Sequence, residues 1–282
     1  MSLSFSSSPS SRAMIGKSLW TWVAVAIVLM HFACAANSQP TNALSDAEIQ
    51  GRALAQKILE QRPTENYTNT GVLSIKSANG ELTKLHIKCE ITLSPAGWQN
   101  VYEVVRTNEF PAGERLPERE KYIIWHVMNQ TNRYGHESDT GDTAETQPSS
   151  PHVPGVITPI SGSELMRPIA GSDFWVADLG LEFFHWPRQK VLKKEFHRQC
   201  ACTVLESRRP PAEQGYSRVV CWIDEDSLGI VEAFAYDWGG KKLKNFYPKN
   251  LEKVNGQYQV ESMVMENLQT GSNSRLDFDL HP

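Results

Sequence analysis

Four cysteines are the residues of this chain with the clearest capacity for covalent chemistry. They follow an N-terminal apolar segment and are Cys89, Cys200, Cys202 and Cys221. If residues 202–224 form a hairpin about Pro211-Ala212, Cys202 lies opposite Cys221 and a disulfide could join the two thiols. Four buried free thiols are an equally open alternative. A zinc site at the Cys200-x-Cys202 pair is weaker, because only His197 lies nearby.

The familiar catalytic motifs are missing from the sequence. It contains no Gly-x-Ser-x-Gly elbow, phosphate-binding loop, dinucleotide fingerprint or His-Glu-x-x-His pair. His86 and His126 lie in predicted strands, where a structural role explains them better than catalysis. The acidic stretch Asp224–Asp226 is typical of a turn, and the basic stretch Lys241–Lys244 is typical of a solvated face. We therefore expect no catalytic residue, no metal and no cofactor, with a hydrolase of the cell envelope as the enzymatic alternative.

Residues 171–187, GSDFWVADLGLEFFHWP, hold the densest group of aromatic side chains. Ser172 or Asp173 can cap a short helix that runs to about Leu179, and Gly180 can end it. The large apolar side chains here are too many for an exposed loop. We expect them to pack against a sheet or to line the space that the sheet encloses.

The residues from 191 onward form short runs rich in Val, Ile, Phe, Tyr and Trp, separated by Gly, Pro and Asn. The runs are Val191–Phe196, Cys202–Ser207, Tyr216–Asp224, Gly229–Asp237, Lys242–Tyr247, Gln257–Glu266 and Ser274–Asp279. Connections this short predict an antiparallel meander. A sheet this extended, with few helices to cover it, must curl. It then closes on itself or leaves a concave apolar face that needs a lid or a ligand.

The first half has the same character. Ser45-x-x-Glu48 predicts a capped amphipathic helix that ends before Pro63. Asn79-Gly80 predicts a hairpin, and further strands follow at Trp98–Thr107 and Lys121–Asn129. Residues 136–154 are polar and proline-rich, so we interpret them as a mobile insertion in one domain of residues 44–282.

The N-terminus predicts export. Basic Arg12 and Lys17 precede the apolar run Leu19–Ala35, and Ala33-Cys34-Ala35 is a small-x-small cleavage signal, so residues 1–35 form a predicted signal peptide. A membrane anchor and lipidation of Cys34 are the alternatives. The net charge of −4 argues against a nucleic-acid partner.

Five stretches of the second half stand in a characteristic order. They are Gly171–Phe174 followed by Asp178-Leu179, Cys202–Glu206, Tyr216–Asp224, Tyr236-Asp237 followed by Gly240–Lys244, and Met263–Gly271. In residue type, order and spacing they resemble motifs of the LolA-like family of outer-membrane lipoprotein-sorting proteins. The first half matches only in its pattern of a leading helix and meandering strands. The insertion and the density of cysteines depart from the family pattern.

The resemblance implies a fold and a class of function. The fold is mainly β: a strongly curved antiparallel sheet that forms an incomplete barrel, with helices plugging its concave face around an apolar cavity. The function is that of an exported carrier in the periplasm or cell envelope. Such a carrier binds the acyl chains of lipids or lipoproteins and takes part in outer-membrane lipoprotein sorting.

Five side chains are our candidates for the cavity lining: Trp125, Phe174, Trp175, Leu179 and Trp222. Ordinary core packing is the alternative for each of them. The alternative for the whole protein is an envelope accessory or scaffolding protein of the same fold, whose interior is filled by its own side chains. The volume of the cavity distinguishes these two hypotheses.

Overall fold

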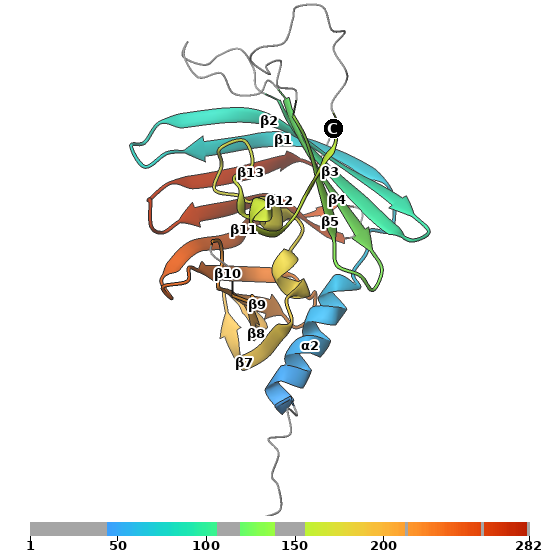
Figure 1. The fold of residues 1–282 in the computed structure, drawn as a ribbon, viewed down its shortest axis with the longest axis vertical. Coiled ribbons are helices and arrows are strands. Elements are labelled where there is room, and N and C mark those ends of the chain that lie inside the picture. The colour runs from blue at the N-terminus through green and yellow to red at the C-terminus, as the bar shows by residue number, and fades with distance from the viewer. Residues whose placement is uncertain (1–43, 106–118, 139–155, 212–213, 255–256, 281–282) are drawn as a thin grey trace, which may run out of the picture. The chain divides into compact units, whose positions relative to one another are not determined.

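A computed structural model describes residues 44–105, 119–138, 156–211, 214–254 and 257–280 of the chain, and Figure 1 shows its fold. The predicted signal peptide lies outside the described residues. So does the predicted insertion from residue 139 to its end, whereas its first residues, His136 to Ser138, belong to a strand. Within the described part of the chain, no helix has the length and apolar composition that crossing a membrane requires.

The described strands form one antiparallel sheet of 13 strands, so the predicted meander is confirmed. Their order is β6-β5-β4-β3-β2-β1-β13-β12-β11-β10-β9-β8-β7, and the sheet is not closed, because β6 and β7 remain as edges. The bounds are β1 Tyr67–Lys76, β2 Leu82–Ser94, β3 Gly97–Val105, β4 Arg119–Val127, β5 Arg133–Ser138, β6 Thr158–Ile160, β7 Arg188–His197, β8 Cys200–Arg208, β9 Arg218–Asp224, β10 Ile230–Tyr236, β11 Lys242–Val254, β12 Gln257–Asn267 and β13 Asn273–Asp279.

The two halves of the sequence meet where β1 pairs with β13, with Leu73 opposite Leu276. Both side chains are almost fully buried. The predicted hairpin between β1 and β2 is present, and Gly80 adopts a φ of 90° in its turn, a conformation that glycine reaches at little cost. The first and last strands thus lie side by side in the middle of one continuous sheet.

Helix α2, Asp46–Leu59, begins with the predicted capping box. The Ser45 backbone N–H donates to Glu48 Oε2 at 2.9 Å, and the Glu48 N–H donates to Ser45 Oγ at 3.4 Å. The helix buries Gly51, Ala55 and Ile58 and packs against the edge strand β7 (Figure 1). It therefore covers one edge of the sheet.

Gly51 sets the close approach of α2 to β7. A Cβ atom at this position would lie 2.6 Å from the backbone carbon and oxygen of Gln189 in β7, and backbone atoms cannot move aside cheaply. We expect Gly51→Ala to lower the free energy of unfolding by about 1–3 kcal/mol, in spite of the better helix propensity of alanine. Urea unfolding measures this, and Gln50→Ala, at an exposed helix position, should not destabilise the protein.

Residues 161–187, here called the crossing segment, connect edge strand β6 to edge strand β7. The segment contains two 3₁₀ turns and one short helix: η1 Gly162–Met166, α3 Val176–Leu179 and η2 Glu182–His185. Its buried side chains belong to the same cluster as side chains of the sheet, among them Leu73, Leu85 and Ile124. The chain thus passes from one edge of the sheet to the other across the apolar face, as the yellow segment in Figure 1 shows.

The helix predicted from Ser172 or Asp173 is shorter than expected. α3 begins at Val176, and the Trp175 backbone N–H donates to the Asp178 carboxylate at 2.8 Å. Asp173 instead accepts hydrogen bonds from β13 and from the turn before it. The predicted end of the helix at Gly180 is confirmed.

Candidate functional site

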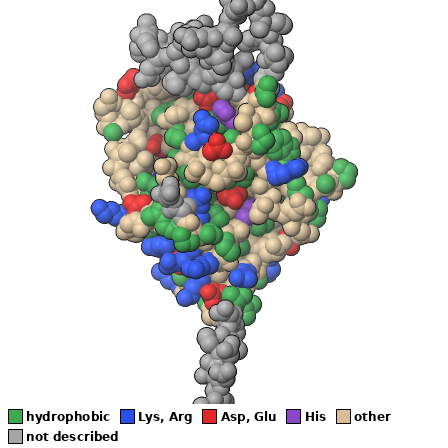
Figure 2. Space-filling view, in the orientation of Figure 1, with side chains coloured by type: hydrophobic (Ala, Val, Ile, Leu, Met, Phe, Trp, Pro, Cys, Tyr) green, Lys and Arg blue, Asp and Glu red, His purple; other side chains and the backbone are tan. Residues whose placement is uncertain are grey.

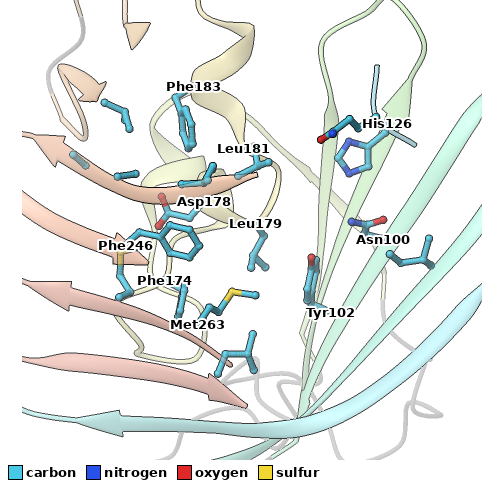
Figure 3. Close-up of a pocket in the computed structure, with 18 of the residues that line it drawn as sticks. Asn100, Tyr102, His126, Phe174, Asp178, Leu179, Leu181, Phe183, Phe246 and Met263 are labelled. Atoms are coloured by element: carbon cyan, nitrogen blue, oxygen red, sulfur yellow. The ribbon is translucent and has the colours of Figure 1, made fainter. Parts of the chain in front are cut away.

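A cavity of about 620 Å³ lies between the crossing segment and the sheet. Most of its lining is apolar, with Ile91, Phe174, Leu179, Leu181, Phe183, Val219, Ile230, Ala233, Ala235, Phe246, Met263, Met265 and Leu276 among the lining residues. Strands β3 and β11 both contribute, although five strand spacings of about 4.8 Å, roughly 24 Å in a flat sheet, separate them. The sheet must therefore curve around the cavity, as the opposed strands in Figure 3 show.

The two walls of the cavity differ in their side chains. One wall, here called the apolar wall, carries Phe174 and Leu179 from the crossing segment together with Phe246 and Met263 from β11 and β12, although Asp178 and Lys244 also border the cavity on this side. The facing wall, from β3 and β4, carries Asn100, Tyr102 and His126 (Figure 3). The wall from β3 and β4, here called the polar wall, thus presents hydrogen-bonding groups opposite large apolar side chains.

A second cavity of about 690 Å³ adjoins the first. The two share Gln61, Arg62, Trp98, His126 and Leu181 as lining residues. The second cavity lies between the C-terminal end of α2 and η2, so the chain after the helix borders both spaces. The two adjoining cavities together form a longer internal space than either cavity alone.

A buried polar network joins Asp178, Tyr216 and Lys244, which belong to the sequence motifs, with Trp175. The Tyr216 hydroxyl contacts both carboxylate oxygens of Asp178, at 2.9 and 3.0 Å. The ammonium of Lys244 lies 3.7 Å from Asp178 Oδ2 and 3.5 Å from the centre of the Trp175 ring. Trp175 in turn stacks on Tyr216, with ring centroids 4.5 Å apart. The network joins the crossing segment to β11 and to Tyr216, two residues before β9.

Burial dominates the protonation of this network. Loss of solvent raises the pKa of Asp178, against the opposing attraction of Lys244. It lowers the pKa of Lys244 to about 8, and Asp178 limits this decrease. Lys244 is only 1% exposed. The pair is therefore a desolvated structural contact between two elements of the fold.

Asp173 ties the crossing segment to the other half of the sheet. Its carboxylate accepts from Ser272 Oγ at 2.7 Å and from Ser274 Oγ at 2.8 Å, and its backbone N–H lies 2.8 Å from Ser274 Oγ. The stretch Gly171–Phe174 thus anchors the segment to the start of β13. This structural role accounts for the presence of the stretch among the sequence motifs.

His126 lies on the polar wall in an environment that disfavours its charge. Its ring stacks on Trp98, with centroids 4.5 Å apart and an angle of 13° between the planes. Loss of solvent lowers its pKa to about 4, although the Asn132 side chain, acting as an acceptor, opposes the decrease. The imidazole is therefore neutral at neutral pH.

The structure brings part of the predicted cavity lining together. Phe174 and Leu179 line the cavity, and Trp175 is half-buried behind them against the core. That these side chains contact a ligand stays a prediction.

Two of the predicted lining residues lie on the opposite face of the sheet, so for them the prediction was wrong. Successive side chains of a strand point to opposite faces, so Trp125 points away from the cavity that its neighbour His126 lines. The Trp125 ring packs over Gly135 of β5. Trp222 likewise points away from its cavity-side neighbours in β9, donates to Glu195 Oε1 at 2.7 Å and packs against His197 and Phe234. The outer face of the sheet carries its own aromatic groups, which account for both residues.

Of the two alternatives left open for the cysteines, the disulfide between Cys202 and Cys221 is wrong. Cys221 is opposite Leu205, and Cys202 is opposite Asp224, so the two thiols lie on different faces of the sheet. All four described cysteines are free. Burial raises the pKa of Cys89 to about 12 and that of Cys202 to about 11, so these thiols carry little thiolate and are unreactive.

The sequence interpretation missed the polar wall and misplaced a lysine. Asn100 and Tyr102 follow Trp98 at intervals of two in one strand, a spacing that puts all three on one face. Lys244 belongs to a stretch assigned to a solvated face, yet it is buried. Its spacing of two from Phe246 was the available signal, because both must share a face of β11.

The comparisons with known proteins agree with this architecture. A family described only as an uncharacterized protein matches residues 154–280, and no curated protein matches the sequence. A DUF1329 family protein from Desulfovibrio piger superposes with a TM-score of 0.63 at 20% identity, over 84% of this chain and 92% of its own. A putative outer membrane lipoprotein-sorting protein domain from Vibrio parahaemolyticus gives 0.63 at 17% identity, over 82% and 91%.

A LolA superfamily protein from Nitrosomonas europaea gives a TM-score of 0.54 at 16% identity, over 81% of this chain and 91% of its own. These likenesses confirm the mainly β, LolA-like fold that the sequence motifs predicted, whereas helices plugging its concave face stay a prediction. The protein is thus a mainly β protein of LolA-like fold with an internal, largely apolar cavity.

Proposed function

We propose that this protein binds the acyl chain of a lipid or of a lipid-modified protein in its cavity and carries it through water. The cavity itself is the observation that supports the proposal. Its volume of about 620 Å³ falls within the range of about 300–1,000 Å³ that small-molecule sites occupy. An accessory or scaffolding protein with a filled interior would have no need of such a space.

The energetics of an acyl chain suit a non-covalent site. Each methylene removed from water contributes about 0.8 kcal/mol, so ten methylenes supply about 8 kcal/mol before the costs of binding. Aliphatic and aromatic side chains of the apolar wall offer this burial without covalent chemistry. The proposed role is therefore binding and release rather than catalysis.

The crossing segment is the proposed cover of the concave face. Asp173 and Asp178 fix it to the sheet, whereas Leu179 at the end of α3 and Leu181 just before η2 line the cavity. In this proposal the crossing segment takes the part of the helical plug that the LolA-like resemblance implies. Release of a chain then requires movement of residues near Leu181 and of the α2 C-terminus, where the two cavities meet.

Export completes the proposal. The signal sequence predicted at residues 1–35 would deliver the protein to the periplasm or cell envelope, and a fold shared with lipoprotein-sorting proteins suits a partner that is a lipid or a lipoprotein. An acyl carrier is useful there, since exposed acyl chains would otherwise have to cross an aqueous space.

A cavity-filling variant tests the proposal. Ala235 of β10 lines the cavity and is 7% exposed, so Ala235→Phe should place a ring in the space that a chain would occupy. We expect wild-type protein, freed of co-purifying lipid, to bind a dansylated C11 fatty acid, and Ala235→Phe to bind it at least tenfold more weakly. Fluorescence titration measures both affinities.

Ala201→Phe is the matched control, because Ala201 is an exposed strand residue of β8 outside the cavity lining. It should bind like the wild type. Folded wild-type protein that takes up no acyl probe, and from which native mass spectrometry detects no lipid, would contradict the carrier function and leave the accessory role.

A further inference from the structure

Two buried polar atoms on the polar wall have no hydrogen-bond partner among the described residues. They are Asn100 Oδ1 and His126 Nε2. The Asn100 side chain is 9% exposed, and both residues line the cavity (Figure 3). They lie on adjacent strands, since Asn100 pairs with Ile124, two residues before His126. Buried polar atoms without partners are rare and costly, so a pair of them in one cavity wall calls for an explanation.

The surroundings of Asn100 indicate which of its atoms is free. Its interaction with Tyr102 favours the charged form of the Tyr102 hydroxyl, as an amide N–H donor does. The carbonyl oxygen Oδ1 has no partner. The atom left facing the cavity is the carbonyl oxygen, which can only accept.

The surroundings of His126 favour one tautomer. The amide nitrogen of Asn132 donates to Gly180 O at 2.8 Å and to Tyr134 Oη at 3.3 Å, and the Asn132 side chain favours the protonated form of the ring, as an acceptor oxygen does. Nε2 has no partner, so a proton on Nδ1 suits this arrangement. The ring is neutral, because burial lowers the pKa to about 4. Nε2 is therefore a second acceptor.

We infer that the cavity selects acyl ligands that carry a hydrogen-bond donor, an amide N–H or a hydroxyl, next to the chain. The donor would lie at Asn100 Oδ1 and His126 Nε2, with the chain against Phe174, Phe246 and Met263 on the facing wall. This inference rests on the proposed function and narrows it to N-acylated or hydroxyl-bearing amphiphiles. A plain hydrocarbon or a dialkyl ester would leave both acceptors desolvated and unpaired, and is disfavoured for that reason.

Two matched pairs of probes test the selection. N-methyldodecanamide has one N–H and N,N-dimethyldodecanamide has none; dodecan-1-ol and its methyl ether compare a hydroxyl in the same way. We expect the donor-bearing amide or alcohol to displace the dansylated fatty acid from wild-type protein at a concentration at least tenfold lower than its partner. The two pairs tell an amide-bearing ligand from a hydroxyl-bearing one.

Variants locate the effect. In the variant that combines Asn100→Leu with His126→Phe, the displacement concentrations of the two probes in each pair should differ by about twofold or less. The affinity for the donor-free probe should be retained or increased. Gln99→Leu, one residue away on the opposite face of β3, should keep the wild-type ratio.

Three outcomes decide the inference. A donor preference that the double variant removes supports it. Equal displacement by both members of each pair in the wild type shows that water alone serves the two acceptors, and overturns it while the proposed function stands. Failure of all four probes to displace a bound fatty acid overturns the inference, whereas wild-type protein that does not bind the fatty acid at all overturns the proposed function as well. The wild-type comparison needs no variant, so it decides even where a variant does not fold.

Discussion

Asp178→Ala is expected to lower the free energy of unfolding by about 3–5 kcal/mol. The substitution removes the acceptor of the Tyr216 hydroxyl and of the Trp175 backbone N–H, and it leaves the ammonium of Lys244 almost fully buried without its counter-charge. An unpaired buried charge costs more than the pair itself contributes, which makes this one of the largest single effects in the protein. Urea unfolding followed by tryptophan fluorescence measures it.

A double variant distinguishes the effect of the unpaired charge from the effect of lost packing. Combining Asp178→Leu with Lys244→Met removes both charges and keeps apolar volume, so we expect this variant to recover at least half of the stability lost by Asp178→Ala. Lys241→Met, at an exposed position next to the same strand, should change the stability by less than about 0.5 kcal/mol. A loss below about 1 kcal/mol for Asp178→Ala would show that the network does not hold the crossing segment.

The strands were predictable because their signals are local. Alternating apolar residues and the Asn79-Gly80 turn gave most strand positions to within a few residues. β5 and β6 were not predicted, since β5 is short and begins just before a polar stretch, and β6 has three residues. Short edge strands depend on their neighbours for stability, so their own sequence carries little signal.

The faces of the strands were harder to assign than their positions. A period of two shows that Trp125 and His126 point to opposite faces, but not which face is inside. Hydrophobicity favoured Trp125, yet the outer face also buries aromatic rings, such as Trp222 against Phe234. The choice depends on curvature that brings β3 and β11 together, which arises from the whole sheet and has no local signature.

The cysteine prediction failed through register. Pairing Cys202 with Cys221 requires a turn about Pro211-Ala212, whereas the observed ladder pairs Cys202 with Asp224. The shift is three residues, and any odd shift sends a side chain to the other face. Hairpins with long connections do not fix their register through the turn, so the sequence could not decide between these pairings.

His126 predicts a loss of stability in acid. The unfolded chain binds a proton at His126 near the ordinary pKa of 6.5, whereas the folded protein binds it only near pH 4. Between these values the unfolded state holds more protons, so stability falls as the pH decreases and this contribution levels off below pH 4. The difference in pKa corresponds to about 3 kcal/mol. We expect the free energy of unfolding of the wild type to decrease by up to this amount from this one residue.

Burial also lowers the pKa values of His136 and His185, so both residues likewise reduce the stability in acid. A comparison of the wild type with His126→Gln therefore isolates the contribution of His126. Between pH 7 and pH 4 the variant should lose about 2–3 kcal/mol less stability than the wild type, whatever the substitution costs at neutral pH. His86→Gln is the control, because His86 is exposed on β2, and it should follow the wild-type curve. Parallel curves for wild type and His126→Gln would mean that the folded protein takes up the proton on this ring as readily as the unfolded chain. His126 would then be in contact with water, and the polar wall would not be the desolvated surface that selects a donor-bearing ligand.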